Sequence, residues 1–313
     1  MPAPITAIFM EPPHEPPGLH EAVHCMNKGN VVVYPPNRGA ISVSSILITG
    51  VTSGIGRACA NLYAERGWDV TGTVRDPGKP VDGLDGQVEL RALDLAEVGG
   101  PERLGAEVLA ADGCPDVVLN NAGMLQFGAL EDVTTAELER IFRVNLFGQI
   151  ELIRAFLPAM RERGSGTIVN VTSLGGMMTF PFFGAYNSTK WALEGISEGL
   201  WHELKPFGVR VKAIEPGFVE TAIWGKVLPG EGADVAGSEA YRPYLRAMVG
   251  FEDSITDRTT PEAAALEIAR AIDDDSDRLR YPVAAYARPI VAARRLLGAQ
   301  FMMRFFHKRW MGR

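Results

Sequence analysis

The stretch ILITGVTSGIG, residues 46–56, decides the fold class of this chain. A short apolar run, 46–49, ends in a glycine-rich turn that opens into a helical pattern from Arg57 to Arg66. In a strand, glycine turn and helix of this kind, backbone N–H groups at the helix N-terminus face the pyrophosphate of a dinucleotide. The glycine spacing is G-x-x-x-G-x-G and not the commoner G-x-G-x-x-G. A tight turn without a ligand is therefore the alternative.

The same alternation of strand and helix continues along the chain. It predicts an α/β protein with a Rossmann-like, doubly wound parallel sheet of about seven strands, helices on both faces, and a single domain over residues 46–285. Further strands are expected at 69–74, 88–90, 117–119, 167–171, 209–214 and 280–283, and further helices at 101–111, 134–160, 186–205, 261–272 and 290–310.

Composition excludes several classes of protein. With 46% hydrophobic and 22% charged residues, the 313-residue chain has the profile of an ordinary soluble globular protein. A net charge of -7 argues against nucleic acid as the main partner. Three scattered cysteines favour neither a disulfide framework nor a metal site, so we expect no metal and a cytoplasmic location. No apolar run approaches the roughly 20 residues that span a bilayer.

Two segments interrupt this pattern. Residues 1–45 contain eight of the 21 prolines, which predicts a disordered N-terminal extension. Whether these residues belong to the native protein stays open, since Met26 could be the true first residue. Residues 218–260 are irregular and rich in glycine, proline and aromatic residues. They are expected to form a substrate lid, with an ordinary surface insertion as the alternative.

Tyr186 and Lys190 are the candidate proton-transfer pair. Four residues apart on a predicted helix, they share one face, so the ammonium can lie beside the phenol. A cation within about 4 to 6 Å lowers a phenol pKa from about 10 by roughly 1 to 3 units, which allows proton transfer near neutral pH. The alternative is that the two side chains merely share a helix surface.

Polar residues lie where predicted strands end. Asn121 and Gly123 follow the central strand, and Ser173 follows strand 167–171, 13 residues before Tyr186. Open α/β sheets bind ligands at this edge, although Asn and Gly also form turns for backbone reasons. Arg75 ends the second strand, where an arginine would suit the 2′-phosphate of NADP. A solvated arginine beside Asp76 is the alternative.

Together these motifs resemble the short-chain dehydrogenase/reductase superfamily over about residues 44–285. In the order and spacing of that family, the chain has TGVTSGIG at 49–56, Asp94-Leu95, NNAG at 120–123, the tetrad Asn145, Ser173, Tyr186 and Lys190, and Pro216-Gly217 followed by Thr221.

The resemblance implies the following roles. Tyr186 is the general acid, Lys190 lowers its pKa and binds the nicotinamide ribose, Ser173 orients the substrate carbonyl, and Asn145 holds a water of the proton relay. The cofactor would be NADP(H), with NAD(H) as the alternative, because Ser53 stands where NADP-preferring relatives often carry a basic residue. The implied cofactor-binding residues are Gly50, Ser53, Gly54, Ile55, Gly56, Arg75, Asp94, Leu95, Asn121, Ala122, Gly123, Tyr186, Lys190, Pro216, Gly217, Val219 and Thr221.

The substrate is expected to be a bulky, apolar carbonyl or alcohol. The aromatic and methionine side chains near the tetrad resemble the pocket walls of relatives that act on steroids, retinoids and lipids; these are Met177, Phe182, Phe183, Phe218 and Trp224. Such residues also fill ordinary cores. A catalytically silent relative that binds a dinucleotide or acts as a scaffold is the alternative function.

The C-terminus and the assembly complete the expectations. Residues 286–313 are predicted to form a basic amphipathic helix, since residues 278–313 contain nine Arg or Lys and no Asp or Glu. Such a helix could rest on an anionic membrane surface, or pack its apolar stripe on the domain. The resemblance implies a homodimer or homotetramer that pairs through helices 145–163 and 186–205.

Overall fold

The computed structural model describes residues 25–27, 30–32, 44–221, 223, 237–253 and 255–312, with only the backbone at 25–27, 30–32, 250–253 and 310. The chain divides into two compact units, residues 1–42 and 43–313. In the first, β1 (Cys25–Asn27) pairs with the antiparallel strand β2 (Asn30–Val32). The predicted disorder of residues 1–45 otherwise concerns almost only residues outside the described ranges.

The second unit is built on a seven-stranded sheet in the order β5-β4-β3-β6-β7-β8-β9, and all of its pairings are parallel. This confirms the predicted doubly wound sheet. The chain runs outward from β3 in one direction and then from β6 in the other, so the topological switch lies between these strands. The strands are β3 (Ser45–Thr49), β4 (Asp69–Val74), β5 (Glu89–Ala92), β6 (Val117–Asn120), β7 (Gly166–Val171), β8 (Val209–Pro216) and β9 (Arg280–Val283).

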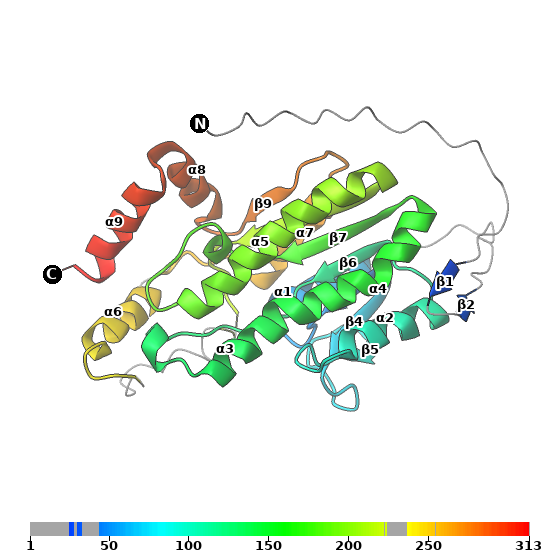
Figure 1. The fold of residues 1–313 in the computed structure, drawn as a ribbon, viewed down its shortest axis with the longest axis horizontal. Helices are drawn as coiled ribbons and strands as arrows, with labels where there is room; N and C mark the ends of the chain where they lie inside the picture. Colours follow the sequence, from blue (N-terminus) through cyan, green and yellow to red (C-terminus); the bar gives the residue numbers. More distant parts are fainter. Residues whose placement is uncertain are drawn as a thin grey trace, which may run out of the picture. The chain divides into compact units, whose positions relative to one another are not determined.

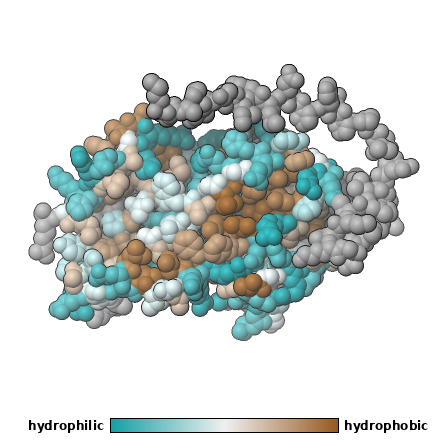
Figure 2. Space-filling model, viewed as in Figure 1, coloured by the Kyte–Doolittle hydropathy of each residue, from teal (hydrophilic) through white to brown (hydrophobic). Residues whose placement is uncertain are grey.

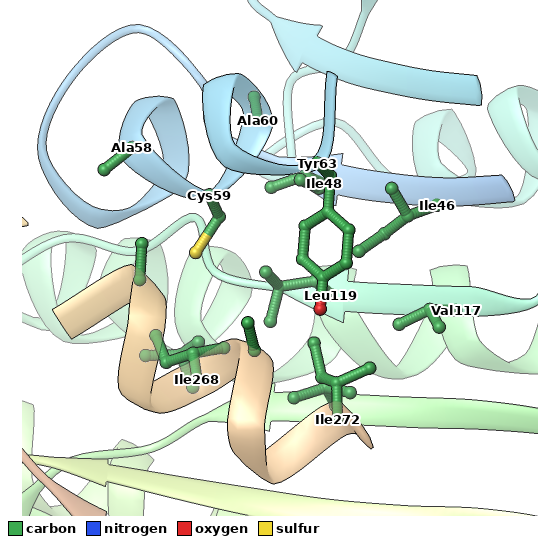
Figure 3. Close-up of a cluster of buried hydrophobic side chains, with 14 of the residues drawn as sticks. Ile46, Ile48, Ala58, Cys59, Ala60, Tyr63, Val117, Leu119, Ile268 and Ile272 are labelled. Atoms are coloured by element: carbon green, nitrogen blue, oxygen red, sulfur yellow. The ribbon is translucent and has the colours of Figure 1, made fainter. Parts of the chain in front are cut away.

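Helices cover both faces of this sheet (Figure 1). On one face, α1 (Gly54–Glu65) and α7 (Pro261–Asp273) pack over the central strands. Figure 3 shows Tyr63 of α1 extending among Ile48, Leu119 and the α7 residue Ile272. On the other face lie α2 (Gly100–Ala111), α4 (Gly148–Arg163) and α5 (Gly184–Leu204). Because both faces are covered, the central strands β3 and β6 contain short continuous apolar runs.

The helix predicted over 134–160 contains a local change of winding. It begins as α3 (Thr135–Phe142), capped by Thr134 in a capping box with Glu137, and passes through a π-helical turn, Arg143–Phe147, into α4. Asn145 lies in that turn. Single π-helical turns inside α-helices occur frequently at functional sites.

Two predicted segments differ from the structure. The C-terminal segment is not one helix but two, α8 (Ala287–Leu297) and α9 (Ala299–Trp310). They are separated at Gly298, whose backbone (φ 80°, ψ 162°) is a conformation that glycine tolerates far better than other residues. The segment expected to be an irregular lid contains the helix α6 (Arg242–Asp253). In the described part of the chain, no helix has the length and apolar character needed to cross a membrane.

Candidate active site

A cavity of about 1400 Å³ lies at the carboxyl ends of the parallel strands. Its position at the switch between β3 and β6 is where open α/β sheets bind ligands. Most of the residues predicted from the sequence line it: Gly50, Ser53, Gly54, Ile55, Arg75, Asp94, Leu95, Asn121, Ala122, Gly123, Ser173, Phe183, Tyr186, Lys190, Pro216, Gly217, Phe218, Val219 and Thr221.

Some predicted residues lie elsewhere. Gly56 and Asn145 support the lining from behind, as shown below, and Phe182 packs against Phe127 with ring centroids 6.1 Å apart. Met177 follows a 3-10 turn that places its neighbour Met178, not Met177, in the buried apolar cluster. Trp224 lies outside the described residues.

The glycine turn is shaped for close approach by a ligand. Gly50 and Gly54 adopt left-handed backbone conformations (φ 74° and 57°). A Cβ atom on Gly56 would lie 2.3 Å from the carbonyl oxygen of Gly50 and 2.4 Å from Nδ2 of Asn121. No side chain among the described residues caps the N-terminus of α1, so its first N–H groups are free to bind an anion. This geometry fits the pyrophosphate of a dinucleotide.

Thr49, the first residue of the glycine-turn motif, stabilises that turn, a role that the sequence analysis did not assign to it. Its Oγ1 accepts hydrogen bonds from the backbone N–H groups of Asn121 and Ala122, both at 2.9 Å. The Asn121 side chain donates to the carbonyl oxygen of Thr49 at 2.9 Å in return. The position of Thr49 immediately before the first glycine was a clue to this role, but its hydrogen-bond partners lie more than 70 residues away in the sequence.

Tyr186 and Lys190 meet as the four-residue spacing predicted. The Lys190 Nζ lies 5.9 Å from the centroid of the Tyr186 ring and donates to the carbonyl oxygen of Val171 at 2.8 Å. The side chains of Tyr186 and Ser173 are hydrogen-bonded to each other. Ser173 also accepts a hydrogen bond from the N–H of Gly175 at 2.9 Å, which orients its hydroxyl.

Electrostatics distinguish the two members of this pair. Burial raises the pKa of Tyr186, and the hydrogen bond with Ser173 opposes that rise. Burial also lowers the pKa of Lys190 to about 8, against the attraction of the Glu194 carboxylate. The ammonium that would favour a phenolate is therefore close to losing its own proton at slightly alkaline pH.

Asn145 joins three elements at the back of the site. Its side chain accepts from the N–H of Met124 and donates to the Met124 carbonyl oxygen, both at 2.8 Å, and donates to Thr189 Oγ1 at 3.1 Å. This contact with Thr189 links the π-helical turn to α5 beside the tetrad. The water-holding role of Asn145 stays a prediction.

The cavity is apolar on the side of Tyr186. A cluster of buried side chains from four segments of the chain lies there, with Phe127, Phe180, Phe182 and Tyr186 packed against it: Leu125, Met178, Phe183, Met248, Met302 and Phe306. Phe180 contacts Phe306 of α9 with ring centroids 5.3 Å apart. Because Phe180 lines the cavity and Phe306 does not, α9 packs behind the apolar wall, which agrees with one of the two alternatives predicted for the C-terminal segment.

The opposite end of the cavity carries cations. Arg75, Asp76 and Lys79 line it. Lys79 is paired with Asp76 at 3.0 Å, whereas Arg75 is exposed and makes no ion pair within the described part of the chain. Arg57 also lines this end, but its guanidinium donates to the carbonyl oxygen of Asp82 at 2.7 Å.

With this geometry in place, comparison with known proteins decides the family. Residues 44–232 match the sequence model of the short chain dehydrogenases. The chain belongs to the short-chain dehydrogenase family. It is therefore an oxidoreductase of that family, as the sequence motifs predicted.

Individual relatives agree with this assignment. A short-chain dehydrogenase from Streptomyces avermitilis has a TM-score of 0.72 and 35% identity, covering 87% of this chain and 97% of its own. A metagenomic short-chain oxidoreductase solved in complex with NADP is 35% identical, with a TM-score of 0.52, over 56% of this chain and 82% of its own.

Two relatives with named activities are similar over most of the chain. The 3-ketodihydrosphingosine reductase of Bacteroides thetaiotaomicron is 32% identical over 72% of this chain and 82% of its own length. The 17-beta-hydroxysteroid dehydrogenase type 1 of Mus musculus is 33% identical over 75% of this chain and 72% of its own length.

Proposed function

We propose that this protein is an NADP-dependent oxidoreductase that interconverts a ketone or aldehyde with an alcohol, on a bulky, apolar substrate. One observation carries the proposal. The Tyr186 phenol, hydrogen-bonded to Ser173 and beside Lys190, lies between the cavity of the glycine turn and the apolar cluster. A proton donor is thus placed where a dinucleotide and an apolar carbonyl would meet.

The roles of the side chains are those that the family resemblance implies. NADPH bound in the cavity supplies the hydride. Tyr186 gives its proton to the carbonyl oxygen, and the Ser173 hydroxyl hydrogen-bonds that oxygen and fixes its place. The Lys190 ammonium would oppose the rise in the phenol pKa that burial causes, and it would bind the nicotinamide ribose. Asn145 holds the water through which Tyr186 recovers its proton.

The preference for NADP over NAD rests on Arg75. Its exposed guanidinium, without an ion pair in the described part of the chain, is available to a 2′-phosphate at the cationic end of the cavity. The NADP complex of the metagenomic relative supports the same cofactor. The remaining cofactor-binding residues are those of the glycine turn and the strand ends that line the cavity.

The apolar substrate class is supported by the cluster around Phe183 and Phe306. A wall of methionine and aromatic side chains excludes water and favours apolar ligands of varied shape. The names of the two relatives, a ketone reductase of a long-chain base and a steroid dehydrogenase, agree with this class.

The experiment that tests the function is an NADPH-oxidation screen over steroids, retinoids, aliphatic ketones and quinones, with Tyr186→Phe beside the natural protein. Loss of the general acid should lower kcat by roughly 10²- to 10⁴-fold while NADPH binding persists. Tyr241→Phe is the matched control, because Tyr241 packs on Phe182 but is not part of the tetrad. Turnover that survives in Tyr186→Phe would refute the role of Tyr186. A protein that binds NADPH but reduces none of these compounds would favour the silent alternative.

Assembly as a homodimer or homotetramer through α4 and α5 is part of the proposal. Figure 2 shows apolar residues gathered over these two helices on the face turned to the viewer. Trp191 of α5 is 44% exposed, and a Cβ on Gly195, one turn further on, would meet no atom within 4 Å. Sedimentation of Gly195→Trp should give a monomer, and an unchanged oligomer would exclude this face.

We place the protein in the cytoplasm, with its C-terminal helices able to contact an anionic membrane surface. The inward face of α9 packs on the domain through Met302 and Phe306. Its flank still exposes Phe301 and Phe305, and Leu296 at the end of α8 is 84% exposed. Apolar side chains among arginines and lysines have the character of an interfacial helix.

A further inference from the structure

The tetrad residue Lys190 is buried together with two carboxylate side chains. Lys190 and Glu194 of α5 are each 4% exposed, and Glu215 of β8 is fully buried. Charged groups are almost never this deeply buried unless they are paired. Because Glu194 follows Lys190 by one helical turn, the two side chains share one face of α5.

One guanidinium serves both carboxylates. Nε of Arg280 lies 2.9 Å from Oε2 of Glu194 and 3.7 Å from Oε1 of Glu215. The Nη2 atom of Arg280 binds the exposed Glu198 at 2.7 Å. In the sheet, Glu215 is in register with Pro282, so Arg280, two residues before Pro282, lies on the same face as Glu215. Arg280 therefore fixes Glu194 against the end of β8, immediately before Pro216 and Gly217.

The hydrogen bonds distinguish the two carboxylates. Glu194 has Oε2 on Arg280, whereas neither oxygen of Glu215 has a hydrogen-bond partner among the described residues. Burial, followed by repulsion from Glu194, raises the pKa of Glu215 to about 7. Near neutral pH Glu215 is therefore partly protonated, and the carboxylate that the guanidinium binds is Glu194.

We propose that Glu194 is a positioning residue, whose buried carboxylate, held by Arg280, is the counter-charge that keeps Lys190 an ammonium beside Tyr186. This inference rests on the proposed function. The hydrogen bond that Lys190 donates goes to the neutral carbonyl oxygen of Val171, which offers a dipole and not a charge. Removing the Glu194 charge would leave burial to act alone on Lys190, and its proton would then be lost at lower pH.

The other charged groups packed around this site do not replace Glu194. Glu215 becomes an anion as the pH rises above about 7, but the carboxylate whose attraction raises the pKa of Lys190 is that of Glu194. Glu198 is more than half exposed and is bound to the far side of Arg280. Arg278 and Arg295 act on Glu215, and Arg280 is itself a cation, so none of the three can hold a proton on Lys190 by attraction. Tyr186 is neutral until it transfers its proton.

The test is the pH dependence of kcat/KM for carbonyl reduction in three variants. Glu194→Gln should move the alkaline limb of the profile down by about 1 pH unit and leave the rate below that limb within a few fold. Glu198→Gln, which removes a carboxylate from the same arginine, should leave the limb in place. Glu194→Asp keeps the charge but withdraws it by one methylene, so its limb should lie between those of the natural protein and Glu194→Gln.

Two outcomes would overturn the inference. One is a Glu194→Gln profile of natural shape, whether or not its rate is lower throughout, which would leave Glu194 a purely structural role. If Glu194→Gln does not fold, the deciding variant is Glu194→Asp. An alkaline limb of Glu194→Asp at the same pH as that of the natural protein would then overturn the inference. The affinity for NADPH, titrated by fluorescence across the same pH range, reports the charge of Lys190 without turnover. A shift in that curve with no carbonyl reduced would support Glu194 while refuting the proposed reaction.

Discussion

The cofactor preference can be tested at a single side chain, Arg75. The 2′-phosphate that distinguishes NADPH from NADH would meet this guanidinium, so Arg75→Ala should act on NADPH alone. A hydrogen bond to a charged group contributes about 1.5 to 3 kcal/mol. Because Arg75 is exposed and water screens its charge, we take the lower end, which corresponds to roughly a 10-fold rise in the NADPH Kd. The NADH Kd should change less than about 2-fold.

The assay is a fluorescence titration of both cofactors at low and high ionic strength. Added salt should reduce the difference between natural protein and variant, since exposed charges are screened over about 10 Å at 0.1 M. Lys79→Ala is the control, because Lys79 lines the same end of the cavity but is already neutralised by Asp76 at 3.0 Å. Equal losses for NADPH and NADH, or a larger loss in Lys79→Ala, would refute the role of Arg75.

Three further changes test the turn, the buried carboxyl and the C-terminal helices. Gly56→Ala forces a Cβ to 2.3 Å from the Gly50 carbonyl oxygen and should cost about 1 to 3 kcal/mol of unfolding free energy and weaken NADPH binding, whereas Gly86→Ala, in open space, should do neither. Burial raises the pKa of Glu215 from 4.5 to about 7, so the contribution of this carboxyl to stability is present below pH 4.5 and lost as the pH rises through 7. Glu215→Gln should therefore reduce the difference between the unfolding free energies that urea denaturation gives at pH 5 and pH 8. Phe301→Glu with Phe305→Glu should abolish flotation with phosphatidylserine liposomes, and Leu266→Glu, on an exposed site of α7, should not. If the natural protein does not float, membrane contact is excluded.

Most of the fold could be predicted because its information is local. The stretch 46–56 and the apolar runs mark strands and turns within a few residues of one another, and all seven predicted strands of the sheet exist. Register within a loop was not predictable: after a single 3-10 turn, Met178 and not Met177 lies in the buried apolar cluster, and the substrate contact of Met177 stays a prediction. The break at Gly298 depends on one backbone conformation that apolar periodicity does not reveal.

The site was predictable where its residues follow a known motif or a helical spacing, as with Tyr186 and Lys190. Its supports were not, because their partners are distant in sequence. Thr49 bonds residues more than 70 positions away, and Arg280 reaches Glu194 across 86 positions. Only Glu194, one turn after Lys190, offered a spacing clue.

The energetics of the buried charges separates stability from function at this site. The pairing of two buried carboxylates with one guanidinium does not satisfy both, since the oxygens of Glu215 and one oxygen of Glu194 lack hydrogen-bond partners within the described residues. Buried ion pairs frequently stabilise less than apolar side chains of similar volume, and one left incompletely paired stabilises less still. The surrounding sheet is apolar, so apolar residues could have filled this position on stability grounds alone. The charges are instead concentrated on the turn of α5 that follows Lys190 and on the strand end that precedes Pro216. The destabilisation that these charges cause is thus confined to the two segments that carry Lys190 and the proposed cofactor loop, where buried charges would serve the proposed reaction.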